Sequence, residues 1–129
     1  MTTILAPISI GELIDKITIL ELKKEYIQDD LKHKNIQREL DELTLIYSEL
    51  TIALELLTVL SGKRDQLKSV NRELWHIENA KRQAEKDQLF GPQFIQTARN
   101  VYLKNDLRAQ IKREINLLLD SGIIEEKSY

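Results

Sequence analysis

Cysteine is absent from this chain of 129 residues, and proline, glycine and aromatic residues are scarce. Without cysteine there are neither disulfide bonds nor thiolate metal ligands, and a reducing compartment suits such a chain. Two prolines and four glycines leave few points at which a helix must end. Because aromatic residues make up only 5% of the chain, leucine and isoleucine are expected to fill the core.

Long apolar runs and a signal sequence are missing as well. No stretch approaches the roughly 20 apolar residues that a membrane-spanning helix needs. The first ten residues, MTTILAPISI, lack the basic flank and the cleavage site of a signal peptide. With 42% hydrophobic and 31% charged residues, the composition is that of a folded domain. We therefore expect one cytoplasmic domain covering residues 1–129, with no membrane contact.

The net charge of −2 hides an asymmetry between the two halves of the chain. Residues 1–62 carry 6 Lys and Arg against 11 Asp and Glu, a net charge of −5. Residues 63–129 carry 13 against 10, a net charge of +3. The two halves are expected to attract each other, either within one chain or between two copies.

Helical periodicity and capping residues predict two long helices in the first half, at about residues 10–28 and 31–60. Ser9 and Glu12 form a capping box, and Asp29-Asp30 marks a turn with a new N-cap. In the second helix, apolar residues alternate spacings of four and three, which favours left-handed packing against neighbouring helices. These residues are Ile36, Leu40, Leu43, Tyr47, Leu50, Leu54 and Leu57.

Two further helices are predicted in the second half, at about residues 63–87 and 93–119. Ser61-Gly62 is expected to end the second helix, Pro92 to begin the fourth, and Gly122 to cap its C-terminus. Residues 120–129 remain as a tail, which is expected to fray or to dock on a basic groove. Since no segment has the pattern of a strand, the fold class is all-α, a bundle of four long helices with short loops.

Three stretches of the chain resemble a bacterial and phage family that is catalogued as a domain of unknown function. They are ISIGELIDKITILELK at the start, VNRELWHIEN in the middle and NDLRAQIKREINLLLDSGIIEEKSY at the end. The resemblance covers nearly the whole chain and implies a short, all-helical protein. It implies no activity, cofactor or catalytic residue.

A line of polar residues borders the apolar face of the third helix, and another borders that of the fourth. If these helices fold back on each other, Glu78 meets Asn105 or Arg108, and Asn71 meets Lys112. Glu78 is expected to be the most buried of them. One interpretation is a structural polar network that fixes helix register; the other is a pocket or active site for a small anionic metabolite. The candidate binding residues are Asn71, Trp75, Glu78, Arg82, Asn105, Arg108 and Lys112.

Two weaker interpretations concern other ligands. Arg64, Lys68, Arg72, Trp75, Arg82 and Lys86 give the third helix a basic face with one aromatic residue, which is typical of nucleic-acid binding. Interleaved acidic residues dilute this charge, so a nucleic acid is not the expected partner. Paired carboxylates in ELID (12–15) and ELDE (39–42) suggest a magnesium-dependent nucleotide pyrophosphohydrolase. That family, however, has its E-x-x-E and E-x-x-D pairs in the opposite order.

The leading hypothesis is a non-enzymatic helical scaffold or interaction module that forms a homo-oligomer. The sequence contains no glycine-rich phosphate loop and no nucleophile motif, and it indicates neither a metal site nor a cofactor. A second apolar stripe on the predicted 31–60 helix, which one small bundle cannot also cover, is expected to contact another subunit. This predicted interface consists of Leu45, Ile52, Leu56 and Val59.

Overall fold

The computed structural model describes residues 2–128, and these residues form helices without any strand. The prediction of an all-α bundle of four helices is confirmed. Met1 and Tyr129, the ends of the predicted domain and tail, lie outside the described residues. The elements are α1 (Ile10–Tyr26), α2 (Asp30–Ser48), the short 3-10 helix η1 (Leu54–Leu56), α3 (Leu57–Lys86) and α4 (Pro92–Leu118).

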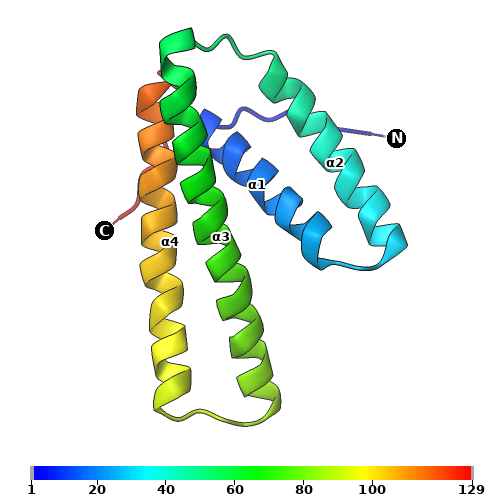
Figure 1. The fold of residues 1–129 in the computed structure, drawn as a ribbon, viewed down its shortest axis with the longest axis vertical. Helices are drawn as coiled ribbons and strands as arrows, with labels where there is room; N and C mark the ends of the chain where they lie inside the picture. Colours follow the sequence, from blue (N-terminus) through cyan, green and yellow to red (C-terminus); the bar gives the residue numbers. More distant parts are fainter. Residues whose placement is uncertain (1, 129) are drawn as a thin grey trace.

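The two longest helices, α3 and α4, form an antiparallel hairpin that runs the length of the molecule (Figure 1). α1 packs against both of them toward the end that contains the start of α3 and the end of α4, and α2 packs chiefly on α1. The other half of the hairpin, which includes the turn between α3 and α4, extends beyond α1 and α2. The bundle is therefore thick at one end and a bare hairpin at the other.

The core lies where α1 crosses the hairpin. Aliphatic side chains from three helices form it, as the shortage of aromatic residues requires, and α2 contributes only Ile36 to the buried residues of the chain. At about 25 cal/mol per Å² of apolar surface removed from water, this cluster is the main source of stability. Its buried members are Ile14, Leu60, Leu67, Val70, Leu74, Ile111 and Ile115.

Three of the residues that were expected to begin helices, Ser9, Asp29 and Pro92, do so in the structure. Ser9 Oγ accepts the Glu12 backbone N–H at 3.0 Å, and Asp29 Oδ1 accepts the Lys32 N–H at 2.8 Å. Pro92 occupies the first turn of α4. The capping box is only half formed, however, because the Glu12 carboxylate pairs with Lys112 instead of returning to Ser9.

The predicted second helix, residues 31–60, is wrong in its second half. α2 ends at Ser48, the chain runs without helix through residues 50–53, and α3 begins at Leu57. Ile52, in this non-helical stretch, packs against the core of α1, α3 and α4, a contact that a continuous helix would lose. Gly62, expected to end a helix, lies inside α3, where Leu60 and Leu67 on either side are fully buried. Burial of these neighbours outweighs the roughly 1 kcal/mol that glycine costs a helix.

The C-termini of α3 and α4 close in the same way without glycine. Gln88 and Asp120 take left-handed backbone conformations, with φ of 58° and 53°. Beyond them, the Leu89 N–H donates to the Ala84 carbonyl at 2.9 Å, and the Ser121 N–H donates to the Asn116 carbonyl at 2.8 Å. These are the long hydrogen bonds of a Schellman motif. The predicted cap at Gly122 is therefore wrong, because Asp120 already occupies the left-handed position.

None of the helices within residues 2–128 combines the length and the apolar run that crossing a membrane requires.

Candidate functional site

A buried carboxylate connects three helices at the centre of the molecule. Asp15, in the second turn of α1, has no solvent exposure. The Nε of Arg108 on α4 lies 3.0 and 3.2 Å from its two oxygens, and the Nη2 of the same guanidinium also binds Oδ2. The Asp15 hydrogen bonds raise the pKa of Arg108, so that this guanidinium stays charged despite its partial burial.

Two further buried side chains complete this network. Asn71 on α3 donates from Nδ2 to Asp15 Oδ1 at 2.8 Å and to Thr18 Oγ1 at 3.0 Å. Thr18 in turn donates to the Asp15 backbone carbonyl at 2.8 Å. Throughout residues 2–128, no buried side-chain nitrogen or oxygen lacks a partner. Such complete pairing is what makes a buried charge tolerable in a small core.

The predicted pairing across the α3–α4 hairpin is wrong. Glu78 pairs with Lys81 on its own helix, and its side chain is 45% exposed rather than the most buried of the set. Arg108 and Lys112 turn instead toward α1, where they bind Asp15 and Glu12. The prediction considered only partners within the α3–α4 hairpin and left out the carboxylates of α1. Asp15, which has no contact with solvent, attracts a cation more strongly than the half-exposed carboxylate of Glu78 does.

Asp15, which was not among the predicted binding residues, belongs to a regular row of buried residues on α1. Gly11, Asp15, Thr18 and Leu22 follow spacings of four, three and four, and all four are buried. They form a second row beside the apolar face of α1. Since this row contains small and polar residues, it permits close helix approach and provides the hydrogen bonds at the same time.

Six of the seven predicted binding residues nevertheless line one groove, of about 530 Å³, between α1, α3 and α4. We call it the Trp75 groove. Ile19, Leu22, Leu74 and Asn79 complete its lining. Helical spacing gathers the predicted residues on facing sides of α3 and α4, as the hairpin argument required. They are Asn71, Trp75, Glu78, Arg82, Asn105 and Arg108.

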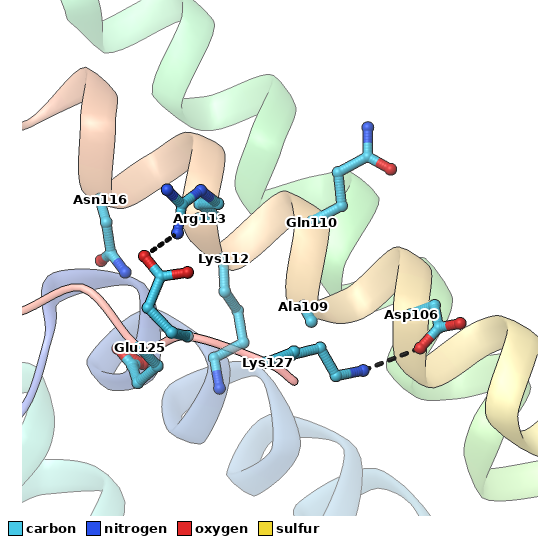
Figure 2. Close-up of a pocket in the computed structure, with 9 residues that line it drawn as sticks. Asp106, Ala109, Gln110, Lys112, Arg113, Asn116, Glu125 and Lys127 are labelled. Atoms are coloured by element: carbon cyan, nitrogen blue, oxygen red, sulfur yellow. Dashed lines mark hydrogen bonds and ion pairs between the residues drawn. The ribbon is translucent and has the colours of Figure 1, made fainter. Parts of the chain in front are cut away.

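Lys112, the seventh predicted residue, lines a different groove, of about 420 Å³, between α4 and the C-terminal tail (Figure 2). We call it the tail groove. Glu126 pairs with Arg113 at 2.7 Å. Lys127 reaches along α4 to Asp106 at 2.8 Å, as a dashed line in Figure 2 marks. Of the two expected fates of the tail, docking on its own chain is therefore the one observed for residues 125–127.

The tail and α4 also close the N-terminus of α1. The Gly11 N–H donates to Asn116 Oδ1 at 2.6 Å, and the Ile10 N–H donates to Ser121 Oγ at 3.1 Å. Ser9 Oγ donates to Glu125 Oε2 at 2.9 Å while it caps Glu12. The first N–H groups of a helix have no partner within the helix, and here a residue 105 positions away provides one.

The basic face of α3 is largely neutralised by α1. Arg64 and Lys68 both pair with Glu21, at 3.2 and 3.5 Å, and Arg72 pairs with Glu25 at 2.7 Å. Hydrogen bonding to Arg72 lowers the pKa of Glu25. The acidic first half thus meets the basic second half within one chain, which leaves less positive charge for a nucleic acid.

The paired carboxylates of the pyrophosphohydrolase interpretation do not converge. Glu12 and Asp15 are bound by Lys112 and Arg108 on α4. The second pair lies on α2, a helix that packs chiefly on α1. Within the described chain, no three histidine, aspartate or glutamate side chains gather at metal-binding distances. A magnesium ion would have to displace two cations from the first pair before it could bind there.

The predicted subunit interface does not form a single stripe, because its residues lie on different elements. Leu45 on α2 is 62% exposed and Val59 on α3 is 48% exposed. Ile52 packs on the core of its own chain, and Leu56 in η1 is half-buried. One long helix with two apolar faces therefore does not exist here, although much of this apolar segment remains in contact with solvent.

Comparison with known protein families finds a match over nearly the whole chain. The model of DUF6165, described as a family of unknown function, matches residues 4–129. Neither the comparison with curated proteins nor that with solved structures gave a match. The matched range contains all three stretches whose resemblance to an uncharacterised family was noted from the sequence, and that resemblance is confirmed. The chain belongs to DUF6165, a family of unknown function.

Proposed function

We propose that this protein is a self-associating helical interaction module, in which residues 45–59 dock against a second copy of the chain. One observation carries the proposal. Five large apolar side chains in this segment lie exposed in a single chain, and Leu54 reaches 81% exposure. They are Leu45, Ile46, Leu54, Leu57 and Val59.

The accessible surface of the chain supports an interface of ordinary size. It measures 8979 Å², whereas a compact monomer of 15.1 kDa is expected to expose roughly 7,100 Å². The excess of about 1,900 Å² arises because the molecule is elongated and half of the α3–α4 hairpin is not covered by α1 or α2. A stable dimer needs about 800 Å² on each partner, so the surface for it exists.

The composition of the segment favours this face over the far end of the hairpin. From Leu43 to Ser61 only Glu49 and Glu55 are charged. At the hairpin end, Leu89 and Ile95 are also exposed, but Lys81, Arg82, Lys86 and Arg99 lie among the neighbouring residues. The centres of protein interfaces are depleted in charge, as residues 45–59 are. An isologous contact across a two-fold axis is the simplest arrangement.

We propose a cytoplasmic location for the protein. The chain contains no cysteine and therefore has no disulfide bond that would need an oxidising compartment.

Sedimentation equilibrium at micromolar concentration tests the proposal. The wild-type chain is expected to sediment at a multiple of 15.1 kDa. The double variant Leu54→Glu/Val59→Glu introduces charge at two exposed positions, so it is expected to fold and to sediment as a monomer. The matched control, Leu89→Glu/Ile95→Glu at the hairpin end, is expected to keep the wild-type mass.

Two results would overturn the proposal. One is a wild-type chain that remains a monomer throughout the concentration range. The other is the reverse pattern, in which the hairpin-end control dissociates while Leu54→Glu/Val59→Glu stays assembled.

A further inference from the structure

The Trp75 groove contains hydrogen-bond donors that the fold does not use. Within residues 2–128, the exposed Arg82 side chain makes no hydrogen bond or ion pair, and the amides of Asn79 and Asn105 make no side-chain hydrogen bond. All three residues line the groove, and Asn79 and Arg82 also line a neighbouring hollow that includes Phe94. Three residues of α3 and α4 whose donor groups have no partner within the described chain thus border one open volume.

Arg108 adds a pre-oriented cation to this groove. Its Nε and Nη2 are bound to Asp15, while its Nη1 donates to no side chain or carbonyl of the described chain. Asp15 has no exposure and is itself held by Asn71 at 2.8 Å, so the guanidinium is fixed from behind. A fixed guanidinium loses little conformational freedom when it binds an oxyanion, which favours binding.

Negative charge in the groove is partly compensated. Glu78 is the single carboxylate in its lining, and Lys81 Nζ lies 3.4 Å from its Oε2. Asp15 lies behind Arg108 and does not line the groove. The lining therefore presents two guanidinium groups and one ion-paired carboxylate.

The remaining lining is apolar or aromatic. Ile19, Leu22 and Leu74 contribute aliphatic surface. Trp75, beside them, stacks on Tyr26 with ring centroids 5.4 Å apart, which holds the indole in place. A volume of about 530 Å³ lies within the range of small-molecule sites, which combine an apolar wall with a few directed polar groups.

We propose that the Trp75 groove binds a small molecule with an apolar body and one carboxylate or phosphate group. Arg82 and Arg108 bind the anionic group, Asn79 and Asn105 donate to its oxygens, and the apolar body lies against Leu74 and Trp75. The inference is independent of self-association, because residues 45–59 contribute nothing to this lining.

Trp75 provides a reporter within the site, because it is the only tryptophan of the chain. Its indole N–H gives one resonance in a proton–nitrogen correlation spectrum. Phenyl phosphate, benzoate and inorganic phosphate are titrated separately, with benzyl alcohol as the uncharged control. Saturable shifts are expected with phenyl phosphate or benzoate and none with benzyl alcohol. The phosphate and carboxylate probes decide which anion is preferred, and inorganic phosphate measures binding without the apolar body.

Two substitutions on the groove are expected to act in opposite directions. Arg82→Gln removes an exposed cation without a structural partner and is expected to weaken binding by at least about tenfold. Glu78→Gln removes the single carboxylate of the lining and is expected to tighten binding. Arg99→Gln is the matched control, because Arg99 on α4 is also exposed but does not line the groove, and this variant is expected to bind as the wild type does.

The proposal fails if no anionic probe shifts the Trp75 resonance at about 10 mM, which exceeds the concentration at which even a weak millimolar site saturates. It also fails if Arg82→Gln and Arg99→Gln weaken binding equally, since the effect would then come from net charge alone. A tightening on Glu78→Gln together with a loss on Arg82→Gln supports it.

Discussion

Asp15 illustrates how one residue determines the arrangement of three helices. An ionised carboxylate without solvent is unfavourable by several kcal/mol unless partners surround it. Arg108 from α4 and Asn71 from α3 are those partners, and each can reach Asp15 only when its helix lies against α1. The pairing therefore fixes how α3 and α4 align against α1. Removing the Asp15 carboxylate leaves the half-buried Arg108 guanidinium without this counter-charge.

A first prediction concerns this pair. Asp15→Asn is expected to lower the free energy of unfolding by about 3 kcal/mol, because a buried ion pair loses one partner. Urea denaturation measures the change. Glu78→Gln, which alters an exposed pair on one helix, is expected to change it by less than about 0.5 kcal/mol. In double-mutant cycles Arg108 should couple to Asp15 and not to Glu78; coupling to Glu78 would restore the hairpin pairing that the structure contradicts.

At the scale of the element, the fold requires the missing side chain of Gly11 but not that of Gly62. At Gly11, in the first turn of α1, an added Cβ would lie 2.5 Å from the Lys112 backbone carbonyl oxygen and 2.9 Å from Asn116 Oδ1. The absence of a side chain therefore lets α1 approach α4 closely enough for Asn116 to cap it. Gly62 in α3 has nothing within 4 Å of its added Cβ and no left-handed backbone, so the fold makes no use of its missing side chain.

Alanine at these two positions gives a matched pair of tests. Gly11→Ala is expected to destabilise the protein by about 3 kcal/mol, because backbone atoms of α4 must move and the Asn116 hydrogen bond is lost. Gly62→Ala is expected to stabilise it by about 0.5–1 kcal/mol through helix propensity. Thermal and urea denaturation measure both. A destabilised Gly62→Ala would mean that a helix ends at residue 62, as the sequence had suggested.

At the scale of the whole molecule, ion pairs join the acidic first half to the basic second half. Glu12, Asp15, Glu21 and Glu25 on α1 bind cations on α3 and α4. A further pair, Lys63 with Glu114, joins α3 to α4 and lowers the pKa of Glu114 through a hydrogen bond. A network of this kind links folding to pH.

The sign of the pH dependence follows from the lowered pKa values of Glu25 and Glu114. Their ordinary value is 4.5, so above that pH both states are ionised and the native pairs contribute fully. As pH falls below 4.5, the unfolded chain takes up protons first, and this contribution disappears as pH passes through the lower native pKa. Stability is therefore expected to fall as the pH drops through and below 4.5.

Glu114→Gln checks this expectation directly. The variant is expected to be less stable than the wild type at pH 7, with the difference shrinking as the solution is acidified. Urea midpoints across the acid range measure it. A difference that stays constant with pH would show that Glu114 titrates with its ordinary pKa in the folded chain.

The sequence by itself determined the helical class and most helix starts. Ser9, Asp29 and Pro92 act through contacts within three or four residues, which are present in the sequence whatever the rest of the chain does. Helical spacing also brought Asn71, Trp75, Glu78, Arg82, Asn105 and Arg108 to one groove, because a hairpin of two regular helices leaves little freedom in which faces meet.

Only the tertiary structure decided which partners these residues take. The break at residues 50–53 exists because Ile52 packs on a core built by distant helices, and the Arg108–Asp15 pair exists because α1 crosses the hairpin at that level. The docking of the tail beside Ser9 likewise depends on where α4 ends relative to α1. Burial and desolvation are properties of the assembled helices, and a helical pattern shows which faces are apolar without showing which other face covers them.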